Sequence, residues 1–386
     1  MSERSVEFHL ARYDTAPHLV FWETTKACGL ACRHCRASAQ TEPAPGELTF
    51  DEGCRLLDRI ASWSTPSPLV ILTGGDCLRR RDLDELVAYG RERHIRFALS
   101  PSVTDELSPE RLAGLFAQGI RSVSISLDGD NPATHDAIRG ITGHFERTLA
   151  ALDTLSAMGF RVQVNTTVMR KNASELARIA HLLDQHQIRT WEVFFLIGVG
   201  RGAELDEVTP DIAEDVCHFL VDVTERGTTV RTVEAPFFRR VQAERRAAPS
   251  RGDERAATSP FYASLRTELL RFPAPERPET ASHSLATGDG RGIIFVGHDG
   301  EVYASGFLPV SLGNVRHDDL TEIYQRHPDL VRMRRGDLEG ECGRCPERQL
   351  CGGSRARAFA RFGRVTAEDP ACSHTEWARR RRLALV

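Results

Sequence analysis

Hydrophobic and polar positions follow two alternating periods along the first half of the chain. Short apolar runs alternate with amphipathic stretches whose apolar positions recur every three or four residues. The apolar runs predict strands at residues 19–24, 69–72, 97–100, 122–127, 162–167 and 192–196. Strands that alternate with helices in this way predict a parallel α/β sheet.

Several of the intervening helices begin at recognisable caps. Thr49 with Glu52 is the pattern of a capping box. Ser108 precedes a proline at the first helical position, and Asn172 with Glu175 predicts another helix start. The helical segments between the strands are therefore well delimited.

The second half of the chain divides into less regular segments. A helix over about 210–226 and one more strand at 229–234 follow the six strands. Residues 241–291 are rich in Arg, Glu, Ala, Pro, Ser and Thr, which predicts a mobile insertion or lid with one helix near 262–272. A turn at 298–300 between two apolar runs then predicts a hairpin.

Composition narrows the class of protein. The chain has 386 residues, enough for one large domain and a smaller one, with a net charge of −4 and a pI of about 6.4. There is no basic domain for nucleic acid, which argues against RNA modification, and the Arg-rich stretch 377–386 is expected to be a solvated tail. With no signal peptide and no long apolar run, the protein is expected to be cytoplasmic and free of the membrane.

Three of the ten cysteines lie close together directly after the first predicted strand. Cys28, Cys32 and Cys35 have the spacing C-x3-C-x2-C. Three thiolates in so short a loop face one point when they hold a soft metal or an iron–sulfur cluster. A structural zinc ion needs a fourth ligand nearby, and the next cysteine, Cys54, falls on the apolar stripe of a helix. The loop therefore predicts a cubane cluster in which one iron is left open.

The loop 27–35 resembles the signature of the radical S-adenosylmethionine (SAM) enzymes, in which SAM chelates the open iron of a [4Fe–4S] cluster. The strand pattern leaves a partial and a full eight-fold barrel open; the resemblance implies the (β/α)6 partial TIM barrel, over residues 18–240 after an extension at 1–17. In either barrel the site belongs at the C-terminal ends of the strands, where this loop stands.

Gly74, Gly75 and Asp76 end the second predicted strand. They are similar to the Gly-Gly-Glu motif of the family, which holds the amino group of SAM, although Asp is shorter than Glu by one methylene. An acidic side chain suits an ammonium group, and glycines allow close approach of the backbone. Cys77 follows and is expected to be a core thiol, with a reactive group beside the cofactor as the alternative.

Further cofactor contacts are expected where the later strands end. Ser100, Ser126 and Asp128 are candidates for the ribose of SAM, with strand-end capping as the alternative. Arg139 resembles an arginine that meets the carboxylate of SAM in related enzymes, with a surface ion pair as the alternative. Asn165 and Leu196 are expected to face the same mouth, the latter against the adenine. A relaxed dinucleotide-binding pattern around Gly200 is discounted because it lies too far from a helix start.

A second set of cysteines lies near the C-terminus. It consists of Cys342, Cys345, Cys351 and Cys372. Their spacing leaves a four-thiolate zinc site and a second [4Fe–4S] cluster open. The block, with Leu312-Gly313-Asn314-Val315 upstream, resembles the auxiliary-cluster extension called SPASM, or its shorter form, twitch. The resemblance implies one fully ligated cluster within residues 292–376, because Ala304, Ser305 and Arg355 stand where a full SPASM domain has further cysteines.

The resemblance also implies the reaction. An electron donor such as flavodoxin or ferredoxin reduces the first cluster, SAM is cleaved to a 5′-deoxyadenosyl radical, and this radical abstracts hydrogen from a small-molecule or peptide substrate. The auxiliary cluster acts as an electron relay, so that the net reaction is an oxidation or a decarboxylation.

Two substrates stay open from the sequence. The stretch 352–357 is similar to the corresponding stretch in radical SAM enzymes of haem d1 and alternative haem biosynthesis. This similarity favours a tetrapyrrole as the substrate. A ribosomal peptide, as in the maturases of pyrroloquinoline quinone and mycofactocin, is the alternative, although residues 1–17 are too few for a leader-peptide-binding domain. A non-catalytic zinc or iron–sulfur scaffold would also explain the cysteines, but it would not need the Gly-Gly-Asp motif.

Overall fold

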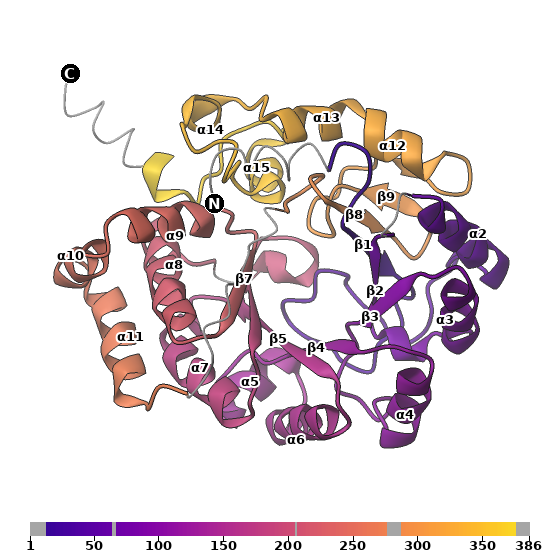
Figure 1. The fold of residues 1–386 in the computed structure, drawn as a ribbon, viewed down its shortest axis with the longest axis horizontal. Helices are drawn as coiled ribbons and strands as arrows, with labels where there is room; N and C mark the ends of the chain where they lie inside the picture. Colours follow the sequence, from indigo (N-terminus) through magenta and orange to yellow (C-terminus); the bar gives the residue numbers. More distant parts are fainter. Residues whose placement is uncertain (1–12, 64–66, 205–206, 276–286, 376–386) are drawn as a thin grey trace.

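One sheet with helices on its outer side organises the molecule (Figure 1). The computed structural model describes residues 13–63, 67–204, 207–275 and 287–375. Its strands are β1 (Leu19–Glu23), β2 (Leu69–Thr73), β3 (Arg96–Leu99), β4 (Ser122–Ser126), β5 (Arg161–Val168), β6 (Thr190–Phe195), β7 (Thr229–Val233), β8 (Ile293–Val296), β9 (Glu301–Tyr303) and β10 (Gly313–Asn314). Their order in the sheet is β10-β9-β8-β1-β2-β3-β4-β5-β6-β7.

The sheet confirms the predicted partial barrel and extends it at both edges. β1 to β6 are the six predicted strands, and each pairs in parallel with the next. β7 continues this order beyond β6, and β8 pairs in parallel with β1 on the opposite side. Within the described residues β7 and β8 do not pair with one another, so the barrel stays open between them.

Helices follow most of the strands. They are α2 (Phe50–Ala61), α3 (Leu83–Glu92), α4 (Pro109–Ala117), α5 (Pro132–Arg139), α6 (His144–Ala157), α7 (Leu176–Gln185), α8 (Pro210–Glu225), α9 (Phe238–Ala247), α10 (Arg251–Thr258), α11 (Pro260–Arg271), α12 (Leu320–Arg326), α13 (Pro328–Arg335), α14 (Gly340–Arg344) and α15 (Arg355–Phe362), with short 3₁₀ helices η1 (Cys77–Arg79), η2 (Ala173–Glu175) and η3 (Gly200–Glu204). The capping box at Thr49 and the cap at Ser108 are both present.

Asn172 differs from its predicted role as a helix cap. Its side chain is completely buried, accepts a hydrogen bond from the Met169 amide and donates to the carbonyl oxygens of Asp128 and Thr167. Only the short η2 begins there, and α7 starts at Leu176. The residue therefore joins the ends of β4 and β5 instead of capping a helix.

The described part of the segment 241–291 is more helical than the predicted mobile lid with one helix, while its residues 276–286 lie outside the described residues. α9, α10 and α11 occupy most of it, and α11 packs against α7 and α8 on the outside of the barrel (Figure 1). Arg245 forms an ion pair with Asp222, and Tyr262 donates a hydrogen bond to the same carboxylate. The polar composition of this segment reflects buried ion pairs between helices, because such charges must be paired when they leave water.

The C-terminal segment closes the open side of the barrel. β8 and β9 form the predicted hairpin, yet β8 is a strand of the barrel sheet, so the predicted domain 292–376 begins inside the barrel. α15 lies between β7 and β8 in Figure 1, and its Arg357 donates to the Glu234 carbonyl oxygen beyond β7. The predicted tail 377–386 and most of the extension 1–17 lie outside the described residues.

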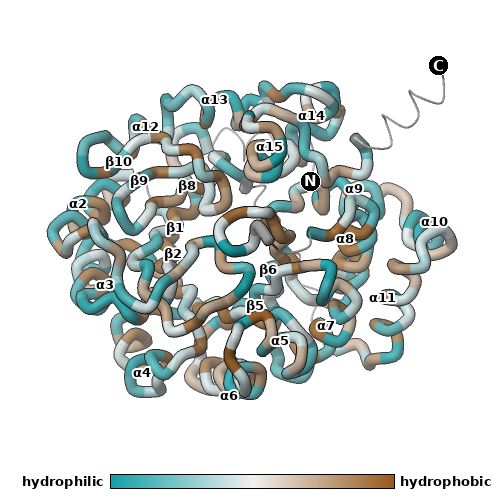
Figure 2. The backbone as a smooth tube through the Cα atoms, turned by 180° about the vertical axis from the view of Figure 1, so that it is seen from behind, coloured by the Kyte–Doolittle hydropathy of each residue, from teal (hydrophilic) through white to brown (hydrophobic). Residues whose placement is uncertain are grey.

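The alternation within the strands separates the core from the barrel interior. In β4, Val123 and Ile125 are buried against the helices, while Ser122, Ser124 and Ser126 share the opposite, inner face. Figure 2 shows hydrophobic colours along the inner strands β1 and β2 and hydrophilic colours over much of the surrounding helices. Among the described residues, no helix has the length and apolar character that a bilayer crossing requires.

Candidate functional site

The three loop cysteines lie together in the turn that follows β1. Cys28 and Cys32 are buried, Cys35 is half-buried, and all three belong to one small packed group. Each sulfur has a donor nearby: the Leu30 amide to Cys28 (3.3 Å), the Ala39 amide to Cys35 (3.5 Å) and the Arg139 guanidinium to Cys32 (3.7 Å). Burial raises the pKa of the Cys28 thiol, so a bound cation is needed to keep it ionised. Hydrogen bonds to sulfur of this kind support iron–sulfur clusters, so these residues fit one.

The glycine turn after β2 holds the cysteine loop from one side. The Gly75 amide donates to the Thr25 carbonyl oxygen (2.8 Å), and the Asp76 amide donates to that of Ala27 (2.7 Å). A Cβ at Gly75 would lie 2.5 Å from the Ala27 oxygen, and Gly74 has φ +153° and packs on Thr25. The two glycines are therefore required for contact between two protein segments, beside any contact with a ligand.

η3 holds the loop from another side. Gly200 has φ +57°, and a Cβ there would overlap the Arg36 carbonyl oxygen. Arg201 donates from Nε to the Cys32 carbonyl oxygen (2.9 Å) and from a terminal nitrogen to that of Ala39 (2.7 Å). The glycine pattern that matched a relaxed dinucleotide fingerprint is thus a packing contact with the cysteine loop.

A buried ion pair lies behind the loop. Arg139, from α5, is 2.6 Å from Asp128 at the end of β4, and His34 approaches the same oxygen at 3.4 Å. Burial opposes the charge of Asp128, yet Arg139 and His34 together lower its pKa. Burial lowers the pKa of His34 to about 4. We expected Arg139 to meet the carboxylate of SAM and Asp128 to meet its ribose; in the structure the two side chains pair with each other, and Arg139 also reaches Cys32.

Asp76 uses its carboxylate within its own loop. The side chain is completely buried and accepts hydrogen bonds from the amides of Leu78 (3.2 Å) and Ser102 (3.4 Å) and from the Thr104 hydroxyl (2.8 Å). Burial raises the pKa of this carboxyl. Both oxygens thus accept hydrogen bonds from protein donors, and the expected contact with the amino group of SAM stays a prediction.

The remaining predicted contacts divide into two groups. Ser100 and Asn165 line a cavity inside the barrel, and Ser126 lies on the same inner face of β4 as the cavity-lining Ser124. Leu196 differs, because its carbonyl oxygen accepts a hydrogen bond from Arg357 (3.3 Å) and its side chain packs with Ile138 and Met169. Leu196 is thus part of the wall between the barrel and α15.

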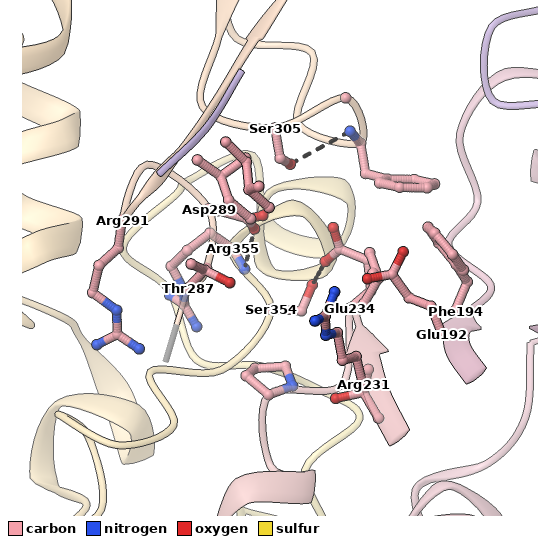
Figure 3. A pocket seen from close by; sticks show the side chains of 18 of the residues that line it. Glu192, Phe194, Arg231, Glu234, Thr287, Asp289, Arg291, Ser305, Ser354 and Arg355 are labelled. Carbon is pink, nitrogen blue, oxygen red and sulfur yellow. Dashed lines mark hydrogen bonds between the residues drawn. The ribbon is translucent and has the colours of Figure 1, made fainter. Parts of the chain in front are cut away.

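The cavity inside the barrel, here called the central cavity, has a volume of about 320 Å³. Side chains of the inner strand faces line it together with β7 and the C-terminal segment. Figure 3 shows Glu192, Phe194 and Glu234 on one side of it and Arg291 and Thr287 on the other. Its size falls within the range of small-molecule sites, and its place inside the barrel suits a bound substrate.

The four C-terminal cysteines come together as predicted. All of them line one cavity of about 200 Å³, here called the auxiliary cavity, with Arg240 and His374. The sulfur of Cys342 accepts from the Asp369 amide (3.3 Å), and that of Cys351 accepts from the Gly353 amide (3.4 Å). Within the described part of the chain, no three His, Cys, Asp or Glu side chains close around a single metal ion. Four thiols around one cavity supply the complete ligand set of a [4Fe–4S] cluster or of a structural zinc ion.

Cys351 connects the two cavities. Cys351, Gly352 and Gly353 line both the central and the auxiliary cavity. Burial raises the pKa of the Cys351 thiol to about 12. A group bound by this thiolate would lie at the wall of the central cavity.

Arg36 connects the cysteine loop to the opposite side of the central cavity. It directly follows Cys35, pairs with Glu23 at 2.8 Å, donates to the Gly306 carbonyl oxygen (3.1 Å) and lies 4.6 Å from the ring centroid of Phe295. Burial raises the pKa of Glu23, but a hydrogen bond from His298 and the charge of Arg36 outweigh burial and lower it. The loop and the C-terminal hairpin are thus tied together across the cavity rim.

The other cysteines are core residues. Cys54 and Cys77 belong to the main hydrophobic core, as predicted, and so does Cys217 of α8. Burial raises the pKa of Cys77 well above its usual value, so its thiol is inert. No reactive role is needed for it.

Sequence reasoning missed the side chains that hold the loop, namely His34, Arg36 and Arg201. Each acts through a partner far along the chain, such as Gly306 for Arg36. Their position within or beside glycine and cysteine motifs was the available signal.

A parallel partial barrel with a three-cysteine loop after its first strand defines a class of iron–sulfur enzymes. A family model described as the radical SAM superfamily matches residues 22–183. The chain is 34% identical over 359 residues to an AdoMet-dependent heme synthase of Methanosarcina barkeri, covering 92% of this chain and 96% of that protein. The chain belongs to the radical SAM superfamily, whose members use a [4Fe–4S] cluster and SAM.

Other relatives differ in their named products. An Fe-coproporphyrin III synthase of M. barkeri is 31% identical, with 95% of this chain and 91% of that protein covered. The mycofactocin maturase MftC of Mycobacterium ulcerans is 29% identical, with 92% and 88% covered. Among solved structures, Streptococcus suis SuiB bound to S-adenosylmethionine has a TM-score of 0.66 at 13% identity, with 96% of this chain and 81% of that one covered. The last likeness shows the shared fold.

Proposed function

We propose that this radical SAM enzyme cleaves SAM at the loop of Cys28, Cys32 and Cys35 and oxidises or decarboxylates a tetrapyrrole bound in the central cavity. One observation carries the proposal: the same cavity is lined by Arg36, the neighbour of Cys35, and by Cys351 of the C-terminal cysteine set. A substrate held there lies between the two cysteine sites.

The residues of the loop have separate tasks in this proposal. Cys28, Cys32 and Cys35 would hold a [4Fe–4S] cluster, which together with SAM would supply the radical chemistry. A donor such as flavodoxin or ferredoxin would reduce this cluster. Arg139 offsets the negative charge of the thiolates, because its guanidinium lies 3.7 Å from Cys32. Asp128 fixes Arg139, and Asp76 positions Ser102 and Thr104 beside Cys28. The buried loop keeps water from the reacting groups.

The inner strand faces supply the remaining contacts with SAM. Ser100, Ser126 and Asn165 offer hydroxyl and amide groups on the inner face, which suit ribose hydroxyls. Gly74 and Gly75 keep the backbone close to the loop. These contacts are proposed from position on one face and from the chemistry of the groups.

The auxiliary cavity would hold a second cluster. Cys342, Cys345, Cys351 and Cys372 supply four thiolates, so no iron is left open to a substrate. When bound, such a cluster supplies an electron acceptor at the wall of the central cavity. Arg240 lines the same cavity and offsets part of its negative charge.

Identity favours the tetrapyrrole among the possible substrates. The relatives named for heme and Fe-coproporphyrin III are 34% and 31% identical to this chain, and the named peptide maturase is 29% identical. A peptide substrate is the second candidate, because the maturase still covers 92% of the chain.

The test is anaerobic turnover by the reconstituted protein with SAM, a reductant and iron coproporphyrin III. We expect 5′-deoxyadenosine together with a porphyrin of lower mass, and neither product from a Cys32→Ala variant. If no deoxyadenosine forms under any reducing condition, the radical function is wrong. If deoxyadenosine forms while the porphyrin mass stays unchanged, the substrate class is wrong.

A further inference from the structure

Two arginines of the central cavity have no acidic partner at ion-pair distance among the described residues. Arg239, from α9, is half-buried, and Arg291, which precedes β8, is 6% exposed. Among carboxyls, Asp289 is the one whose charge reaches Arg239, and burial raises the pKa of that carboxyl; the Cys351 thiol, when ionised, is the first group whose charge favours both guanidinium cations. Two guanidiniums therefore share one wall without a dedicated counter-ion.

Arg240, which follows Arg239 on α9, has the carboxylate partner that Arg239 and Arg291 lack. Burial disfavours the cation of Arg240, but the charge of Glu214, 2.5 Å away, outweighs burial and raises its pKa. Burial lowers the pKa of Arg239, and burial together with the charge of Arg239 lowers that of Arg291 to about 10. Buried charges are normally paired, and neither guanidinium has an ion pair with a described carboxylate, so this wall of the cavity can accept an anionic ligand beside Cys351.

Backbone contacts hold both guanidiniums in place. Arg291 donates to the Gln349 carbonyl oxygen (2.7 Å), and Arg239 donates to that of Leu350 (3.4 Å) and to that of Thr287. A guanidinium has five N–H donors in a planar fork, so further donors are left for a ligand. Both arginines are thus fixed on the segment that leads into Cys351.

The acidic groups of the cavity do not cancel this charge. Burial raises the pKa of Glu192 and raises that of Glu234 well above its usual value. The Ser354 hydroxyl donates to Glu234, and Gln163 donates to Glu192 (2.9 Å). The cavity therefore contains the guanidiniums of Arg239 and Arg291 together with carboxyls whose ionisation burial disfavours; Figure 3 shows Arg291 on one side and Glu192 and Glu234 on the other.

We propose that Arg239 and Arg291 together bind a carboxylate side chain of the substrate beside Cys351. The assignment rests on the proposed function, and it makes these arginines specificity-determining residues for a tetrapyrrole propionate. The planar fork of arginine suits a carboxylate bidentately. A propionate held there lies next to the thiolate that borders the auxiliary cavity.

The test measures binding to the reconstituted enzyme by absorbance titration. The probes are iron coproporphyrin III and its methyl ester, in which the carboxylates are neutral. Arg239→Gln and Arg291→Gln are each expected to weaken binding of the acid by about tenfold to a hundredfold and to leave the affinity for the ester unchanged. Arg291→Lys should recover part of the loss. Arg246→Gln, an exposed position of the same helix, is the matched control.

Three outcomes would overturn the assignment in distinguishable ways. Equal loss of acid and ester binding would mean that the variants distort the cavity. Unchanged binding with a shifted potential of the auxiliary cluster would assign both arginines to the Cys351 thiolate alone. If the wild-type enzyme binds neither probe yet cleaves SAM, the tetrapyrrole class and this inference fail together, while the radical function stands.

Discussion

The two cysteine sites are assembled in opposite ways. Cys28, Cys32 and Cys35 come from one turn and depend on distant segments, namely the glycine turn after β2, α5 and η3, to hold that turn. The C-terminal cysteines come from α14, from the turn before α15 and from the chain after α15, and they enclose a cavity of their own. The first site is thus one loop that other segments hold in place, whereas the cysteines of the second site themselves line the cavity.

This difference explains what each site can do. Three thiolates leave one iron of a cubane without a protein ligand, so a small molecule can bind there. Four thiolates leave none, and the second site can only exchange electrons through its wall. Cys351 belongs to that wall and also borders the central cavity. The comparison therefore predicts different consequences for equivalent substitutions.

Removal of cysteines should give the largest effect. A triple Cys28, Cys32 and Cys35 to Ala variant is expected to lose all SAM cleavage and to lower the iron content from about eight to about four per chain. Replacement of the four C-terminal cysteines should lower iron by the same amount but abolish substrate turnover with some deoxyadenosine still formed. Iron analysis measures the cluster content of the two variants, and chromatography measures the deoxyadenosine that they form. Zinc retained at the C-terminal site of the wild type would contradict the cluster there.

Loss of the buried ion pair behind the first site should be the next largest effect. Arg139→Leu leaves the completely buried Asp128 without its partner, and we expect the free energy of unfolding to fall by about 3–5 kcal/mol. Arg326→Leu removes an exposed pair with Glu322 and should cost about 0.5 kcal/mol or less. Anaerobic denaturant unfolding compares them. Similar losses in both variants would show that the buried pair does not hold the loop.

Close packing of η3 on the cysteine loop gives a smaller effect. Gly200→Ala adds a Cβ that overlaps the Arg36 carbonyl oxygen at a positive φ, and we expect a loss of about 2–4 kcal/mol. Gly363→Ala meets nothing within 4 Å at a similar φ of +68°, so it should cost only about 1 kcal/mol. Thermal unfolding of both variants checks the difference. Equal shifts would mean that only backbone strain matters at Gly200.

Acid sensitivity should belong to the first site; it is the smallest effect near pH 7 and grows as the pH falls. His135 and His144, buried behind Asp128, are hydrogen-bonded to each other at 2.8 Å, and burial lowers their pKa to about 3 and about 4. The unfolded chain binds protons below about pH 6.5, while the folded one does not until lower pH. Their contribution to stability is therefore complete above pH 6.5 and is lost as the pH falls towards 4.

The two histidines together give a limiting slope of about 2–3 kcal/mol per pH unit between about pH 6.5 and about pH 4, because each proton contributes about 1.4 kcal/mol per unit. The variant with both histidines replaced by Gln should show a flatter dependence of the unfolding free energy on pH. Denaturant unfolding at a series of pH values measures it. An unchanged slope in the variant would assign the acid sensitivity to other groups.

Features with local causes were predictable from the sequence. β1 to β6, the caps at Thr49 and Ser108 and both cysteine sets follow from spacing within short segments. Periodicity reports which face of a segment is buried, and a cap reports where a helix begins. These signals do not depend on which other segment the helix or strand packs against, so they can be read from the sequence alone.

Features that depend on distant partners were not predictable. The charges of α9 to α11 indicated a mobile lid, but Arg245 and Arg240 are paired with Asp222 and Glu214 of α8. β8 was expected in a separate domain, because nothing in its sequence states that it pairs with β1. Arg139 and Asp128 were each assigned a contact with SAM, and the ion pair between them was not foreseen. In each case the sequence identified the charged or apolar residues, but it did not show which distant residue or strand each of them contacts.

The most direct measurement of the central claim is electron paramagnetic resonance of the two reduced cysteine variants during a SAM titration. The chain that lacks the C-terminal cysteines should show a cluster signal that changes with SAM, since an open iron is left at the loop. The chain that lacks Cys28, Cys32 and Cys35 should show a signal that SAM leaves unchanged. A response to SAM in the second chain, or none in the first, would contradict the account.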